Sequence, residues 1–155
     1  MKISKDKKLC EEYIGKHPVI SISLKGINAA SYEAAFELTV KTIKGAVQKA
    51  GFLKMSDKLD EDEKKEYRAI LDENMSEATL FWSLKNLSEL LEKHYETKVI
   101  LLIDEYDVPL AKAFENGYYD KMVFLIRNLL EQTLKTNNSL KFAVMTGCMR
   151  ISKES

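Results

Sequence analysis

The chain has 155 residues, and its 24 Lys and Arg balance 24 Asp and Glu to a formal net charge of zero. This length predicts one domain, and 45% hydrophobic with 31% charged residues is typical of a folded globular protein. The longest apolar runs, at 99–103 and 122–126, are far shorter than the roughly 20 residues that cross a bilayer, so no membrane partner is expected. The amino-terminal KISKDKKLCEE has no apolar secretory segment, which predicts a cytoplasmic protein. Neutral charge gives no signature of nucleic-acid binding and leaves that question open.

The first half of the chain predicts a strand followed by helices. Residues 18–24 (PVISISL) read as a strand because β-branched and apolar residues alternate with serine. A helix is expected from a Ser31 cap to about Ala50, with Gly51 as its stop. The charged stretch 54–75 predicts a solvated helix with connectors. The expected buried face of the first helix consists of Ala35, Leu38, Thr42, Ala46 and Val47.

The second half repeats this alternation. Residues 76–96 predict an amphipathic helix. Trp82 could extend its apolar face or anchor a partner, and core packing is the role expected for it. The predicted strand at 98–103 contains the unbroken apolar run 99–103, which indicates that both of its faces are covered. Asp107 is expected to cap a short helix that begins near Pro109. The apolar stripe of the long helix consists of Leu80, Leu84, Leu87, Leu91 and Tyr95.

A further helix and a last strand complete the pattern. The helix is expected to bury Tyr118, Met122, Leu125, Leu129 and Thr133, and the strand covers residues 141–146. Strands that alternate with helical segments predict a three-layer α/β domain with a mostly parallel sheet of about three strands, near 18–24, 98–103 and 140–146.

Polar side chains follow the second and third predicted strands. Asp104 and Glu105 come directly after an apolar run, Thr146 ends the last strand, and Arg150 follows it. In open parallel sheets ligands bind at the carboxyl ends of the strands, so these groups are expected to converge at one edge if the strands are neighbours. The alternative is a purely structural role, in which these acids cap the next helix and Arg150 is a solvated loop residue.

Four apolar residues followed by Asp-Glu form the Walker B pattern of P-loop ATPases. One rigid strand-end carboxylate holds hydrated Mg²⁺ beside phosphates, and the adjacent glutamate polarises a water for attack. The chain itself contains no P-loop motif G-x-x-x-x-G-K-[ST], since its one Gly-Lys pair, Gly15-Lys16, precedes a strand and is followed by His17.

Three stretches, residues 17–26, 98–128 and 142–155, resemble the predicted AAA-ATPase-like family of bacterial proteins. They contain IDEYDVP (103–109), NGYYD (116–120) and the terminal TG-x-x-RISKES (146–155). The resemblance implies a P-loop ATPase core that uses ATP and Mg²⁺, with Asp104 as the magnesium-associated acid, Glu105 as the catalytic glutamate and Thr146 as the sensor. No motif secures a role for Arg150, which could neutralise developing charge.

The resemblance also implies that the chain is an internal fragment. In the family a first strand and P-loop precede the region matched here, so residues 1–155 correspond to the second to fourth core strands. We therefore expect the missing P-loop segment of the same protein as a partner. The family's sheet order places the first strand beside the fourth, so the 141–146 strand should have a free edge, open to homodimer formation unless residues 150–155 cover it.

The same residues fit two other classes of function. The acidic edge could belong to a protein-interaction module that binds a partner. Alternatively, Asp104, Glu105 and Asp107 could act directly in a metal-dependent phosphohydrolase or nuclease. Metal binding without nucleotide would favour the last of these.

Overall fold

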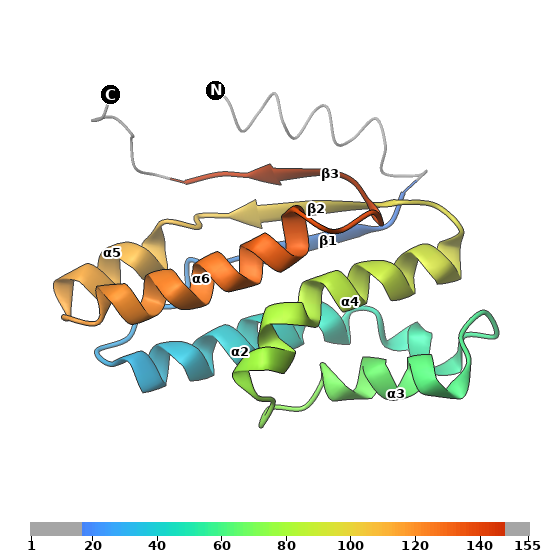
Figure 1. The fold of residues 1–155 in the computed structure, drawn as a ribbon, viewed down its shortest axis with the longest axis horizontal. Coiled ribbons are helices and arrows are strands. Elements are labelled where there is room, and N and C mark those ends of the chain that lie inside the picture. The colour runs from blue at the N-terminus through green and yellow to red at the C-terminus, as the bar shows by residue number, and fades with distance from the viewer. Residues whose placement is uncertain (1–16, 148–155) are drawn as a thin grey trace.

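The computed structural model describes residues 17–147 (Figure 1). Its strands are β1 (Val19–Ser23), β2 (Val99–Asp104) and β3 (Leu140–Met145). The connection from β2 to β3 contains α5 (Val108–Glu115) and α6 (Tyr119–Leu134). The connection from β1 to β2 is longer and contains α2 (Tyr32–Gln48), the short 3₁₀ helix η1 (Gly51–Met55), α3 (Glu61–Ala69) and α4 (Glu77–Tyr95).

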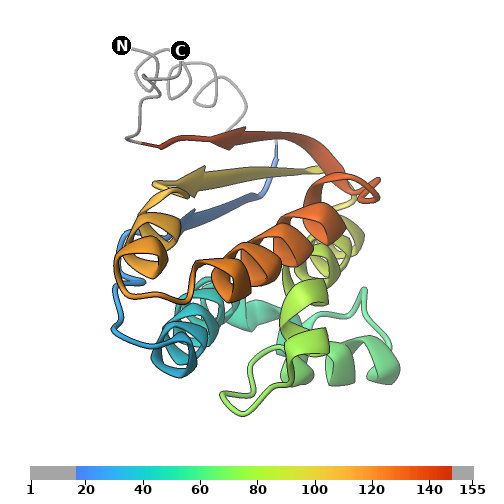
Figure 2. The ribbon, with the colours of Figure 1, turned by 60° about the vertical axis from the view of Figure 1, so that its left-hand side comes forward.

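The strands form one open, fully parallel sheet in the order β1-β2-β3. This confirms the predicted α/β class and parallel sheet. Residues 17–147 form the sheet and one helical layer (Figure 1), which is consistent with a three-layer α/β fold. Both connections step in the same direction across the sheet, and right-handed crossovers then place their helices on the same face. Figures 1 and 2 show α2, α4 and α6 packed side by side against that face.

The core lies between this helical layer and the sheet. Ile20 and Ile22 point into it from β1, and Leu101 and Ile103 from β2. The predicted stripe of α4 is confirmed at Leu80, Leu84, Leu87 and Leu91, and that of α6 at Met122, Leu125, Leu129 and Thr133. Each fully buried large aliphatic side chain contributes about 1.5–3 kcal/mol, so this interface holds the strand ends in place.

Several surface details differ from the predicted pattern. Trp82 is 43% exposed and Tyr95 49% exposed, so neither packs in the core as expected. Trp82 instead lies beneath the Lys85 ammonium, 4.7 Å from its ring centre, which stabilises an exposed indole. Gly51 does not end a helix, because α2 has its C-cap at Lys49 and Gly51 begins η1.

The buried face of α2 is also rotated from the predicted one. It centres on Thr39 and Ile43, whereas Leu38, Thr42 and Ala46 are half-buried. Burial of Thr39 costs little because its hydroxyl donates to the Ala35 carbonyl at 2.7 Å. Thr39 can therefore occupy a core position because it has a hydrogen-bond acceptor within its own helix, whereas a pattern based on hydropathy alone assigns that position to neighbouring residues.

The charged stretch at 54–75 is more than a solvated helix. Tyr67 of α3 is fully buried, and its hydroxyl donates to the Val47 carbonyl at 2.6 Å. Burial raises the pKa of Tyr67. Asp60 and Glu63 form a capping box at the start of α3, so the charges fix the helix end while the aromatic ring docks it onto α2. No helix within residues 17–147 has the length and apolarity needed to span a bilayer.

Candidate active site at the carboxyl edge of the sheet

The three strands end together at one edge of the sheet. Ser23 of β1 is in register with Asp104 of β2, and Ile103 of β2 with Met145 of β3. The last ladder bond runs from the Thr146 N–H to the Ile103 carbonyl at 2.9 Å. This register places the residues that follow β2 and β3 directly beside one another.

Asp104 and Thr146 are in contact at this edge. The Thr146 hydroxyl donates a hydrogen bond to Oδ1 of Asp104, and both side chains are half-buried. The convergence of an acid and a hydroxyl, predicted from parallel strand ends, is therefore observed. A carboxylate has about four lone-pair sites, so Asp104 keeps acceptor capacity beyond the bond from Thr146.

Glu105 has a backbone conformation that only a constrained residue adopts. Its φ is +54°, in the left-handed region that costs a non-glycine residue about 1–2 kcal/mol. Hydrogen bonds on both sides hold the segment: the Leu24 N–H donates to the Asp104 carbonyl at 2.9 Å, and the Tyr106 N–H to the Thr146 carbonyl at 3.1 Å. Strain of this kind at a strand end is a common property of functional sites.

The Glu105 carboxylate makes no hydrogen bond or ion pair with any residue in the 17–147 range, and it is half-buried. A carboxylate next to Asp104 that has no partner among residues 17–147 is available to accept a hydrogen bond from water. This arrangement distinguishes Glu105 from Asp104, which is engaged by Thr146.

Asp107 does not cap the following helix as predicted. It occupies the N-cap position of α5, but its backbone is helical, with φ of −83°, and its side chain accepts no capping hydrogen bond. An N-cap side chain reaches the free N–H groups from an extended backbone, which Asp107 lacks. Its buried carboxylate lies instead beside Gly147, where Oδ1 is 2.8 Å from the position that a Cβ would occupy.

We expect Gly147→Ala to destabilise the protein by about 1–3 kcal/mol, because the new methyl group would clash with Asp107 and with the Tyr106 ring, 3.0 Å away. Urea unfolding would measure the change. Gly26→Ala is the matched control, since nothing lies within 4 Å of its Cβ position. Equal stability of the two variants would show that the edge accommodates the methyl group without cost.

Arg150 lies outside the described residues, so its relation to this edge stays a prediction. Within residues 17–147, no group of three or more His, Cys, Asp or Glu side chains is arranged to hold a metal ion. Asp104, Glu105 and Asp107 accordingly do not form such a group.

Sequence reasoning missed two residues of this edge. Ser23 is placed beside Asp104 by the strand register, and the signal was its position at the end of the first predicted strand. Gly147 has a steric role in the close approach of the β3 end to residues 106–107. A glycine directly after a strand-ending threonine indicates the close approach of another segment, but the sequence does not show which segment it is.

The fold and the edge together define a parallel α/β domain with an acid and a hydroxyl in contact at adjoining strand ends. The family model described as "Predicted AAA-ATPase" matches residues 2–155. The chain therefore belongs to the predicted AAA-ATPase-like family. No curated protein and no solved structure matches the chain.

Proposed function

We propose that this chain carries the Walker B and sensor residues of an AAA-like ATPase. Asp104 is the magnesium-associated acid, Glu105 the general base, and Thr146 the sensor at the end of the neighbouring strand. The observation that carries the proposal is the hydrogen bond from Thr146 to Asp104 across adjoining parallel strand ends. Membership of the predicted AAA-ATPase family supports it.

The donor atoms at this edge suit a hydrated magnesium ion. Asp104 offers carboxylate oxygens and Thr146 a hydroxyl, and hard oxygen ligands are those that Mg²⁺ prefers. One carboxylate is enough, because Mg²⁺ at nucleotide sites keeps several waters and is also held by phosphates. When bound, the ion would neutralise charge on the phosphates of ATP.

Glu105 would act on the attacking water. Its left-handed backbone turns the chain immediately after Asp104, and its carboxylate is free of protein partners in the described structure. A carboxylate in that state can accept a proton from a water positioned for attack on the γ-phosphate. The hydrogen bond from Thr146 to Asp104 would link the end of β3 to the proposed magnesium and water site.

The proposal includes a requirement for a P-loop from elsewhere in the same protein. Backbone N–H groups and a lysine of that loop normally hold the β- and γ-phosphates. The 155 residues contain no such motif. We therefore propose that the chain by itself is inactive as an ATPase.

Isothermal titration of the chain with Mg-ATP tests this proposal. We expect no saturable binding at micromolar concentrations, because a single carboxylate holds hydrated Mg²⁺ weakly without the phosphate cradle. Addition of the P-loop segment should produce binding that Asp104→Ala reduces and Asp57→Ala, an exposed acid elsewhere, leaves unchanged. A sub-micromolar isotherm from the chain alone that Asp104→Ala abolishes would contradict the requirement for a P-loop.

A further inference from the structure

The outer edge of β1 has no strand beside it among the described residues, where β2 is its single neighbour. The Ile100 N–H donates to the Pro18 carbonyl, and the Leu24 N–H donates to the Asp104 carbonyl, both at 2.9 Å. Backbone groups of successive strand residues point to opposite edges, so the even-numbered residues face β2. The N–H and C=O groups of Val19, Ser21 and Ser23 therefore face outward.

This edge lacks the features that normally protect a strand from pairing. Its sequence, VISIS, contains no charged residue, and the nearest proline, Pro18, precedes the strand. The edge of β3 carries a single charged residue, Lys141, near its amino-terminal end. Native sheets protect exposed edges with charges, prolines or bulges, and an edge without them is suited to accept another strand.

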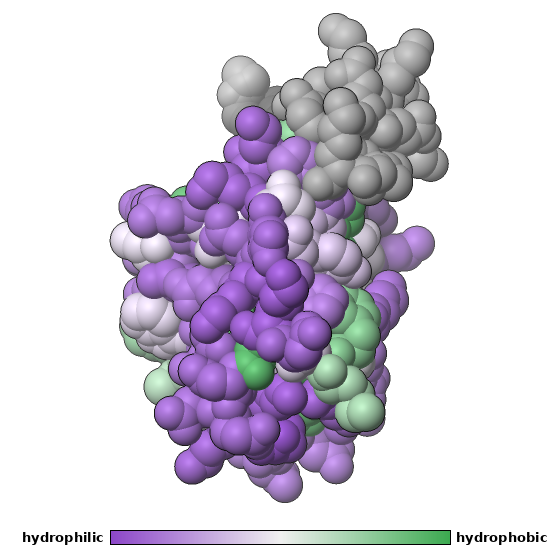
Figure 3. All heavy atoms as spheres, turned by 90° about the vertical axis from the view of Figure 1, so that its right-hand side faces the viewer, coloured by the Kyte–Doolittle hydropathy of each residue, from purple (hydrophilic) through white to green (hydrophobic). Residues whose placement is uncertain are grey.

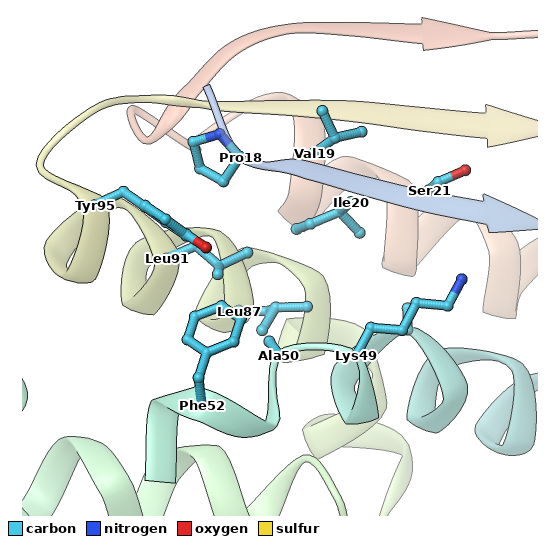
Figure 4. A pocket seen from close by; sticks show the side chains of 11 residues that line it. Pro18, Val19, Ile20, Ser21, Lys49, Ala50, Phe52, Leu87, Leu91 and Tyr95 are labelled. Atoms are coloured by element: carbon cyan, nitrogen blue, oxygen red, sulfur yellow. The ribbon is translucent and has the colours of Figure 1, made fainter. Parts of the chain in front are cut away.

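A shallow pocket opens beside the start of this edge (Figure 4). Its floor is formed by the buried side chains of Leu87, Leu91 and Ala50. Phe52 and Tyr95 form an aromatic wall, with ring centres 5.7 Å apart, and both remain about half exposed to solvent. Exposed apolar side chains that line a concave surface favour an apolar partner group.

One cation lies at the rim of the pocket. Lys49, at the C-cap of α2, lines it and is exposed, and Figure 4 shows its side chain extending toward β1 near Ser21. Lys49 forms no ion pair with any residue from 17 to 147. The rim therefore offers an unpaired positive charge next to outward-facing backbone groups.

We propose that the outer edge of β1 binds an extended segment of a partner protein as an added strand. A row of outward backbone groups needs a partner whose own backbone is extended, which a helix cannot provide. An apolar side chain of that segment would fill the pocket, and a carboxylate on the same face would pair with Lys49. The pocket lies at the start of β1, whereas Asp104 lies at the opposite, carboxyl edge, so this surface is separate from the proposed ATPase site.

The test uses the 155-residue chain and a blocked peptide, TVTFTET, which places valine, phenylalanine and glutamate on one face of a strand. We expect NMR shift changes and slowed amide exchange at Val19, Ser21 and Ser23. Two versions of the peptide, N-methylated at alternate sets of residues, separate strand addition from simple apolar binding. The version methylated on the edge that faces β1 should lose binding and the other should keep it, because only one set of amides pairs with β1.

Charge variants test the role of Lys49. Lys49→Glu should lower the affinity of the chain for TVTFTET by about tenfold and raise its affinity for TVTFTKT, in which lysine replaces the glutamate. Lys41→Glu, on the same helix but outside the pocket, should change neither affinity. Absence of peptide binding at millimolar concentration, or equal binding of both N-methylated versions, would overturn the proposal. Protection of Val19, Ser21 and Ser23 that rises with protein concentration alone would assign this edge to a second copy of the chain and would also overturn it.

Discussion

In the proposed ATPase, assayed with the P-loop segment present, Glu105→Gln is expected to lower ATP hydrolysis by about 10²–10⁴-fold while Mg-ATP binding stays largely intact. Glutamine preserves the shape and the left-handed turn but cannot accept a proton from water as a carboxylate does. The Glu105 carboxylate has no described protein partner, so its loss should leave the fold unperturbed. Steady-state phosphate release and equilibrium nucleotide binding, measured on the same preparation, would separate the two effects.

Two comparisons make this result specific. Glu73→Gln removes an exposed carboxylate from a loop and should leave turnover unchanged. Asp104→Ala should instead weaken the magnesium-dependent part of nucleotide binding and release the Thr146 hydroxyl from its acceptor. If Glu105→Gln hydrolyses ATP at the parental rate, Glu105 is a structural acid and the assignment of the general base is wrong.

The contact between Asp104 and Thr146 could be predicted because it depends on topology. An apolar run that leads directly into a carboxylate marks a buried parallel strand, and parallel strands share their carboxyl edge. Because β2 and β3 are neighbours, the residues that follow them lie close together, and this does not depend on how the side chains of the core pack. The register, which places Ser23 opposite Asp104, depends on the packing of whole helices and cannot be read from a local pattern.

The backbone of Glu105 and the position of Asp107 could not be predicted for a different reason. Both depend on hydrogen bonds between segments far apart in the sequence, such as the bond from the Tyr106 N–H to the Thr146 carbonyl. An Asp one residue before a helix is usually a cap, and here the approach of Gly147 and the helical backbone of Asp107 override that preference. Trp82 and Tyr95 show the same limit, since an amphipathic pattern does not fix where the buried arc ends.

The outer edge of β3 is the basis of a second prediction, which concerns self-association of the chain. In the described structure β3 pairs only with β2, and the bond from the Thr146 N–H to the Ile103 carbonyl fixes which residues face β2. Backbone groups of Ala143 and Met145 consequently point outward, beside the apolar side chains of Phe142 and Val144. We propose that the chain self-associates through this strand, with sedimentation velocity showing a shift from monomer to dimer as concentration rises.

Ala143→Lys should abolish this dimer, because a charge on an edge strand opposes pairing, while Ala30→Lys, which adds the same charge in the loop before α2, should not. In the dimer the amides of Ala143 and Met145 should exchange as slowly as those of Phe142 and Val144, which already face β2. A species that stays monomeric at high concentration, with fast exchange confined to Ala143 and Met145, would mean that the edge is open but does not pair. Slow exchange at both residues in a strict monomer would instead show that another segment of the same chain covers the edge.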